Sequence, residues 1–162
     1  MKISTKGRYA LRVMVDLGLH NTGDWIRLKD IATRQNISEK YLEAIVKTLV
    51  TNSLLEGKRG KNGGYRLLRK PAEYTVWDII SVTETGELAP VACLEEGAET
   101  CPMRNECPTI SMWQDFGNVE REYFSKITIQ DLLDKAAGKA AANPKADPAE
   151  TALYISQLSA CL

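Results

Sequence analysis

Three of the four cysteines in this chain lie within a stretch of fifteen residues, at Cys93, Cys101 and Cys107. Thiolates are soft ligands, and closely spaced sets of three or four suit zinc or iron–sulfur clusters. Zinc sites usually present cysteine pairs two to four residues apart, whereas these cysteines are separated by seven and five residues. The wider spacing favours a loop that wraps around something larger than one ion. Pro102 and Pro108 restrict the preceding cysteines to extended conformations, which stiffens the loop.

The compartment decides how such cysteines are interpreted. No apolar run reaches the roughly 18 residues needed to span a bilayer, and the N-terminal segment lacks a signal-peptide pattern. We therefore expect a cytoplasmic protein. Cytoplasmic thiols are kept reduced, so clustered cysteines there bind metal or sense redox state more often than they form structural disulfides. An iron–sulfur site, a thiol-only redox switch and a zinc-binding or metal-free loop remain open at this point.

The net charge of zero conceals two halves of opposite sign. Residues 1–70 carry 15 Lys and Arg against 6 Asp and Glu, a net charge of +9. Residues 71–162 carry 6 against 15, a net charge of −9. A basic half beside an acidic half indicates a polyanion-binding module joined to something else. Chance clustering on solvated surfaces is the alternative.

The N-terminal part predicts a series of short helices. Residues 4–20 have apolar side chains at helical spacing, and a turn at 21–24 follows. A minor strand at 25–28 and a short helix at 29–35 come next. Ser38 begins a further helix, because its hydroxyl can cap free backbone amides. Two helices joined by a few residues, the second with a polar N-terminal face, match the helix-turn-helix pattern.

A basic hairpin follows these helices. Two apolar runs flank a glycine-rich tip between Gly60 and Gly64, which predicts a β-hairpin wing. Asn62, Gly63 and Gly64 permit the positive backbone dihedrals that a tight turn needs. A turn alone does not require cations, so the four around this tip predict a contact with DNA. These cations are Lys58, Arg59, Lys61 and Arg66.

The C-terminal half predicts a loop between helices. Residues 74–82 fit a short helix, and 83–108 have no sustained period, which suggests a segment tied down by a bound cluster. Residues 110–127 predict a long helix with a broad stripe that a second chain would bury; packing within the chain is the alternative. Thr128 begins a last helix at 129–137, and the low-complexity remainder ends in one more short amphipathic segment. The stripe on the long helix at 110–127 consists of Trp113, Phe116, Val119, Glu120, Tyr123, Phe124 and Ile127.

Taken together, these segments resemble the Rrf-type winged-helix transcription regulators, and most closely the IscR type; NsrR, RirA and CymR are relatives. The matching stretches are MKISTKGRYALRVMVDL, LKDIATRQNISEKYLEAIV, LLEGKRGKNGGYRL, YTVWDIISVTE and the cysteine trio, and the resemblance covers residues 1–127. It implies a mainly α fold in which a winged helix-turn-helix domain with a small β-wing is joined to a long dimerisation helix. It also implies a homodimer that binds palindromic double-stranded DNA.

The resemblance further implies an iron–sulfur cluster bound by the three cysteines, with [2Fe–2S] favoured over [4Fe–4S]. The IscR type has a histidine three residues after its third cysteine, where this chain has Ile110. NsrR-like relatives use an acidic residue near the N-terminus of the other subunit, where this chain has Arg8. The fourth ligand stays open, and the candidates are Glu106, Thr109, Ser111, Asp115, a residue of the partner subunit or an exogenous small molecule.

We therefore expect a DNA-binding repressor that senses iron–sulfur or redox status, and no enzyme activity. The chain has one histidine, His20, and no nucleotide-binding glycine pattern after a strand, so nothing suggests catalysis. A cluster-free regulator that takes its signal from thiol oxidation or a protein partner is the alternative. An iron–sulfur electron-transfer protein would leave the basic half unexplained.

The expected roles divide among base edges, the minor groove and phosphates. Glu43 can accept a hydrogen bond from the cytosine amino group, and Arg59 would reach the minor groove. The predicted DNA-binding residues are Ser38, Lys40, Tyr41, Glu43, Lys58, Arg59, Lys61, Gly63, Gly64, Tyr65, Lys2, Ser4, Lys6 and Arg8. The predicted divisions are a DNA-binding domain at 1–82, a cluster loop at 83–109, a dimerisation helix with the following helix at 110–137, and a flexible tail at 138–162.

Overall fold

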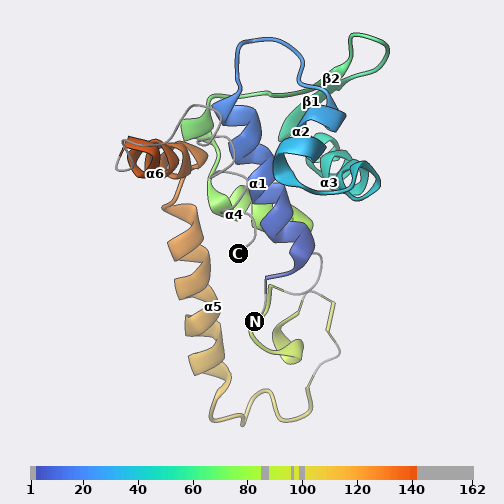
Figure 1. Cartoon of the computed structure of the whole chain (residues 1–162). Helices are drawn as coiled ribbons and strands as arrows, with labels where there is room; N and C mark the ends of the chain where they lie inside the picture. Colours follow the sequence, from blue (N-terminus) through green and yellow to red (C-terminus); the bar gives the residue numbers. More distant parts are fainter. Residues whose placement is uncertain (1–2, 85–87, 96, 99–100, 142–162) are drawn as a thin grey trace.

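The computed structural model describes residues 3–84, 88–95, 97–98 and 101–141, with side chains up to residue 138. Its helices are α1 (Thr5–Leu19), α2 (Leu28–Gln35), α3 (Glu39–Thr51), α4 (Val76–Thr83), α5 (Ile110–Ser125) and α6 (Ile129–Ala141) (Figure 1). Its strands are β1 (Leu55–Lys58) and β2 (Gly64–Leu67), and single 3₁₀ turns lie at Pro71–Glu73 and Ala92–Leu94. The prediction of a mainly helical fold with a small β-wing is confirmed.

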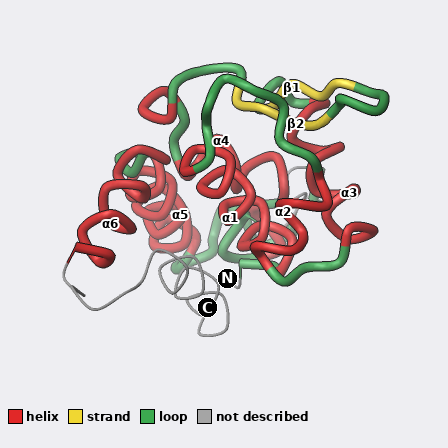
Figure 2. The backbone as a smooth tube through the Cα atoms, turned by 45° about the horizontal axis from the view of Figure 1, so that its top comes forward, coloured by secondary structure: helices red, strands yellow, loops and turns green. Residues whose placement is uncertain are grey.

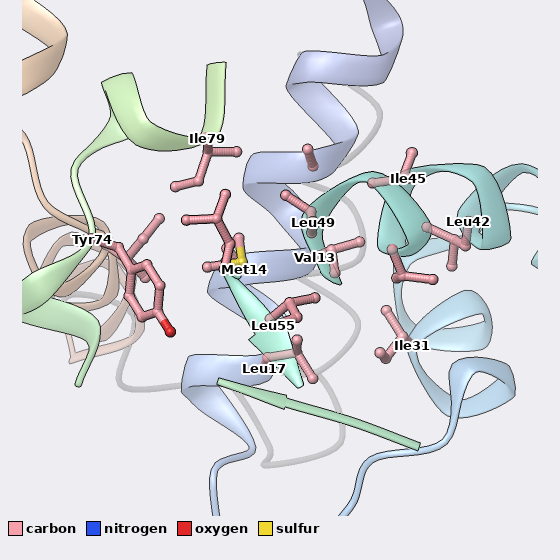
Figure 3. Packing of buried hydrophobic residues seen from close by; sticks show 14 of the residues in the cluster. Val13, Met14, Leu17, Ile31, Leu42, Ile45, Leu49, Leu55, Tyr74 and Ile79 are labelled. Carbon is pink, nitrogen blue, oxygen red and sulfur yellow. The ribbon is translucent and has the colours of Figure 1, made fainter. Parts of the chain in front are cut away.

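Helix α1 forms the centre of the core. Val13, Met14 and Leu17 recur at the spacing of one helical face and are at most 1% exposed. They pack with buried residues of α3, among them Ile45 and Leu49 (Figure 3). Because α3 is fixed by its buried face, its opposite face is held rigidly toward solvent.

Side chains at the helix ends determine where the helices begin and stop. The hydroxyl of Ser38 accepts from the backbone N–H of Tyr41, as predicted. Asn36 adopts the left-handed conformation that ends α2, which makes the connection to α3 tight. The buried Asp16 of α1 accepts from Arg34 (2.7 Å) and from Gln35 (2.9 Å), which fastens α2 to α1. These contacts set the angle of the helix-turn-helix pair.

The wing is a two-stranded antiparallel hairpin whose tip projects from the helical body (Figure 2). Lys58 pairs with Gly64 at the tip end of the ladder. The expected strand at 25–28 is reduced to one bridge between Ile26 and Tyr65, because α2 already begins at Leu28. That bridge nevertheless ties the connection between α1 and α2 to strand β2 of the wing.

Helix α5 extends away from the helical body, and α6 returns to it (Figure 1). The junction of α5 and α6 is anchored by Val76, whose N–H donates to Ile127 O, and by Ile129, whose N–H donates to Tyr74 O. Ile129 is fully buried and joins the core with Leu133. Thr128 caps α6 as predicted, because its hydroxyl accepts from the N–H of Asp131. The short amphipathic segment expected at the C-terminus lies outside the described residues.

Candidate nucleic-acid interface and cysteine loop

The N-terminal half of α3 presents a polar face on a buried support. Ser38, Lys40 and Glu43 are exposed, as the polar N-terminal face of this helix predicts, and Tyr41 is exposed as well. The ring of Tyr41 meets the ring of Tyr9 edge-on, with centroids 5.8 Å apart. Tyr41 is thus fixed on one side while it stays 38% exposed on the other. This face has the donors, acceptors and rigidity that reading base edges requires.

The wing divides its cations into two groups. Arg59 and Lys61 are exposed at the tip. Lys58 and Arg66 instead lie over the ring of Trp25, at 5.7 and 4.4 Å from its centroid. Arg66 also pairs with Glu56 across the two strands at 2.8 Å. The expectation of four cations at the tip is therefore corrected: Arg66 serves the base of the wing, where it holds the hairpin on Trp25.

The wing needs glycine at positions 63 and 64 for a reason other than the predicted one. Positive φ in the tip occurs at Gly60, at 104°, and not at Asn62, Gly63 or Gly64. A Cβ at Gly63 would collide with the carbonyl oxygen of Lys58, and one at Gly64 with that of Ile26. Gly63 and Gly64 therefore permit close approach of backbones. Tyr65 pairs with Gly57 next to the tip end of the ladder and is half-buried, so these three residues shape the wing.

Trp25 has no counterpart among the predicted functional residues, although it holds the wing in place. We expect Trp25→Ala to weaken DNA binding by about five- to tenfold, because without the indole ring Lys58 and the hairpin are less ordered. Fluorescence anisotropy with a labelled duplex measures the affinity, and circular dichroism checks the fold. Trp25→Phe is the matched control and should retain most of the affinity. Equal binding by Trp25→Ala and the unsubstituted protein would contradict this role.

The N-terminus of α1 combines cationic side chains with contacts inside the protein. Lys6 is half-buried, whereas Arg8 is exposed and donates to the hydroxyl of Thr5. The hydroxyl of Ser4 donates to Glu84 at 2.7 Å and accepts from the N–H of Gly7 at 3.1 Å. Ser4, expected to bind phosphate, is thus engaged within the protein. Lys2 lies outside the described residues.

The three cysteines lie between α4 and α5, in residues 88–109, which we call the cysteine loop. They are free thiols, each half-buried. Arg104 donates to the carbonyl oxygen of Cys93 at 3.2 Å, which ties the two halves of the loop together. Within the described part of the chain, no group of three or more His, Cys, Asp or Glu side chains is placed to hold a metal ion. The donor set has the chemistry of thiolate–iron binding. Holding a cluster with all three thiols would require the loop to close further.

Cys107 is the thiol with a perturbed environment. Its Sγ lies 3.4 Å from the hydroxyl of Thr109, immediately before α5 begins at Ile110. The hydrogen bond from the Thr109 hydroxyl, together with those from the backbone N–H groups of Thr109 and Ile110, lowers the pKa of the Cys107 thiol. A lowered pKa raises the thiolate fraction at neutral pH, and the thiolate is both the nucleophile and the metal ligand.

We expect Thr109→Val to raise the pKa of Cys107 and to slow its alkylation at pH 7 by about twofold or more. The difference should vanish at high pH, above the pKa of Cys107 in both proteins, since both thiols are then ionised. Iodoacetamide labelling of the metal-free protein, followed by peptide mapping, measures the rate at each cysteine. Ser111→Ala is the control, and an unchanged pH profile in Thr109→Val would contradict the assignment.

His20 lies away from the cysteine loop, at the C-terminal end of α1. Its Nδ1 is 2.8 Å from the carbonyl oxygen of Asp16, which agrees with a helix-terminal role. Two residues that matter structurally, Trp25 and Glu84, were not singled out from the sequence. Trp25 precedes a basic hairpin, a weak signal for a stacking platform. Glu84 gives no local signal, because its partners lie eighty positions earlier.

Helix α5 presents two different faces. One faces a cleft of about 930 Å³ that α4 and the loop after it also line, with residues that include Trp77, Glu84, Pro90 and Trp113. The other carries exposed apolar side chains, so the predicted stripe is divided: Trp113 turns into the cleft, while Phe124 and Ile127 are half-buried. The exposed apolar residues are Met112 (51%), Phe116 (48%), Val119 (62%) and Tyr123 (62%).

These features agree with comparisons to known proteins. A family model described as "Rrf2: Iron-dependent Transcriptional regulator" matches residues 3–135. The chain belongs to the Rrf2 family. Its relatives include Protein rrf2 of Nitratidesulfovibrio vulgaris, 34% identical over 85% of this chain and 90% of that protein. The regulator IscR of Pectobacterium atrosepticum is 34% identical over 83% of this chain and 80% of that protein.

Solved Rrf2-family structures share the fold. CymR of B. subtilis, described as a global cysteine regulator, is 35% identical in sequence to this chain and superposes with a TM-score of 0.65. The match covers 83% of this chain and 98% of the CymR chain. T. potens IscR is 34% identical, also with a TM-score of 0.65, and the match covers 84% of this chain and 88% of the IscR chain. The chain is therefore a DNA-binding transcriptional regulator with a winged helix-turn-helix, and not an enzyme. None of the helices in the described part of the chain has the length and apolar character of a membrane span.

Proposed function

We propose that this Rrf2-family regulator is a homodimeric repressor that reads a palindromic operator and responds to iron–sulfur or redox status through Cys93, Cys101 and Cys107. The observation that carries the DNA-binding part is the exposed face of α3 beside the wing. Ser38, Lys40, Tyr41 and Glu43 project from a helix whose opposite face is fully buried. The major groove admits such a helix, and rigidity preserves the geometry of its base contacts.

The wing and the N-terminus of α1 would supply the sequence-independent contacts. Arg59 at the projecting tip suits the minor groove, where the potential is negative. Lys58, Lys61, Lys6 and Arg8 would bind phosphates, and Lys2 would join them. Affinity should then fall steeply with salt, with a slope of about −0.9 per phosphate contact.

The exposed apolar face of α5 supports the proposed dimer. Large apolar patches on one face of a helix that stands away from the body favour an interface. A two-fold pair of α5 helices would place two α3 helices on half-sites about one helical turn apart.

The cysteine loop would connect these parts. It leaves the DNA-binding domain after α4 and enters α5 at Ile110. Thiolate-bound iron supplies redox sensitivity when it is present, and Cys107, with its lowered thiol pKa, is suited to such a ligand. Ordering of the loop would change the separation of the reading helices, and hence operator affinity.

A cluster-free switch is the second candidate. The three thiols are free, and in the described residues they do not converge on one metal position. The solved relatives also include a cysteine regulator beside an IscR, so family membership leaves the signal open. Thiol oxidation or a protein partner would then act on the same loop.

Selection of bound sequences from a random duplex library tests the DNA-binding part. We expect a palindromic consensus with two half-sites. Glu43→Ala should relax one position of each half-site, reducing discrimination there by about 1–3 kcal/mol. Arg59→Ala should lower affinity for all sequences more evenly. Recovery of no consensus at any salt concentration would contradict a sequence-specific regulator, and Glu39→Ala is a control on the same helix.

A further inference from the structure

Glu84 carries a buried carboxylate for which the proposed function gives no role. Its side chain is 4% exposed, at the C-terminal end of α4. The carboxylate accepts from the backbone N–H of Ser4 at 3.2 Å and from the Ser4 hydroxyl at 2.7 Å. Ser4 in turn caps α1, because its hydroxyl accepts from the N–H of Gly7. A buried acid is thus committed to holding the first turn of α1.

Gly7 indicates how closely the two parts fit. It lies in the first turns of α1 and is buried. Glycine is a poorer helix former than alanine, so its presence inside a helix needs a reason. A Cβ at Gly7 would collide with Oε1 of Glu84. The glycine therefore provides the space into which the carboxylate inserts.

Glu84 lies between two functional regions. On one side, the turn that it holds carries Lys6 and Arg8, the described cations assigned to phosphates at this end of α1. On the other side, Glu84 lines the cleft together with Pro90 and Leu94 of the cysteine loop. Cys93 follows Glu84 by nine positions in the sequence and is adjacent to Leu94. One side chain therefore contacts the DNA-binding end of α1 and borders the loop that holds the thiols.

We propose that Glu84 is a positioning residue that fixes the phosphate-facing N-terminus of α1 and couples it to the cysteine loop. When the loop moves and Glu84 withdraws, Ser4 loses its partner and the turn that presents Lys6 and Arg8 is released. This inference rests on the proposed function. It places the connection between the sensing loop and the phosphate contacts within a single chain.

Whether Glu84→Gln weakens or tightens DNA binding distinguishes a positioning role from a simple effect of charge. Removing a negative charge near phosphate-binding cations should tighten binding if only charge mattered. Positioning predicts the opposite, because the NH₂ of Gln cannot accept from the Ser4 N–H as Oε2 does at 3.3 Å, and the neutral amide oxygen accepts from the Ser4 hydroxyl more weakly than a carboxylate does. With a labelled mixed-sequence 30-base-pair duplex, we expect about tenfold weaker binding and a shallower salt dependence, by about 0.9 for each phosphate that the variant no longer neutralises. Asp134→Asn on α6 is the charge-matched control and should bind as the unsubstituted protein does.

Three further variants separate positioning from loss of fold. Ser4→Ala should reproduce the weaker binding with Glu84 intact. Gly7→Ala should lower the melting temperature, because the new Cβ displaces Glu84. The double variant Gly7→Ala/Glu84→Ala should melt higher than Gly7→Ala alone, while its DNA binding stays weak. This combination distinguishes a stable but unpositioned helix from an unfolded one.

The coupling is measured at the loop. In metal-free protein that carries Cys161→Ser, we expect the mixed-sequence duplex to slow alkylation of Cys93 by about threefold or more. The same duplex, at a concentration that saturates Glu84→Gln, should have no effect on that variant.

The outcomes are distinguishable. Failure of the unsubstituted protein to bind duplex even at low salt would remove the proposed function itself. Binding by the unsubstituted protein that Glu84→Gln matches or exceeds would overturn the positioning role alone. Protection of Cys93 that is equal in both proteins, or absent from the unsubstituted one, would overturn the coupling.

Discussion

Val119→Glu on α5 is expected to convert the proposed dimer into a monomer and to weaken operator binding by about 100-fold or more. Val119 is 62% exposed in a single chain and lies among Phe116 and Tyr123 on one face. Burying an unpaired carboxylate in an apolar interface costs several kcal/mol. Two linked reading helices exceed the affinity of one by about 10²–10⁴. Light scattering coupled to size-exclusion chromatography measures the mass, and anisotropy with the selected operator measures the affinity.

The control for this prediction places the same side chain elsewhere on α5. Gln114→Glu adds a carboxylate on the flank that lines the cleft, away from the apolar face. It should leave both the dimer and the affinity unchanged. A dimer that persists in Val119→Glu would place the interface elsewhere, and a monomeric unsubstituted protein would contradict the proposed homodimer.

Cys93→Ala, Cys101→Ala and Cys107→Ala are each expected to abolish iron binding in protein prepared without air. Each removes one of three thiolate donors from a loop that supplies no more, so the remaining two cannot hold the group. The unsubstituted protein should contain iron and acid-labile sulfide and absorb between roughly 300 and 600 nm. Chelation should bleach these bands and change operator affinity by about 5- to 150-fold, the usual range of allosteric coupling.

Cys161 provides the matched control, because it is the one cysteine outside the trio. Cys161→Ala should keep the iron, the colour and the response to chelation. A colourless protein whose affinity is unaffected by all three substitutions would contradict the cluster. A colourless protein whose affinity changes on oxidation, and no longer does so with Cys107→Ala, would instead support the thiol switch.

The two predictions address separate steps of one mechanism. The first concerns how the proposed dimer would hold two α3 helices at a fixed distance, and the second concerns what would change that distance. Glu84 would lie between them, since it borders the cysteine loop and holds the first turn of α1. A regulator built in this way transmits a change over short contacts within each chain.

Local chemistry in the sequence determined most of the architecture. Apolar spacing predicted α1 and α3, because a helix with one apolar face must bury it. The hydroxyls of Ser38 and Thr128 placed helix starts correctly, since capping depends on residues only three positions away. The spacing of the cysteines and the division into a basic and an acidic half are likewise properties of the sequence alone.

Only the tertiary structure decided how side chains distant in the sequence share their contacts. The sequence predicted a DNA contact for Arg66 as much as for Arg59, but Trp25 and Glu56 hold Arg66 at the base of the wing. Gly64 suggested a turn, yet its reason is the carbonyl of Ile26. The contact of Glu84 with Ser4 joins positions eighty residues apart, and no local pattern encodes such a separation. Packing brings these pairs together, so periodicity and capping could not have predicted them.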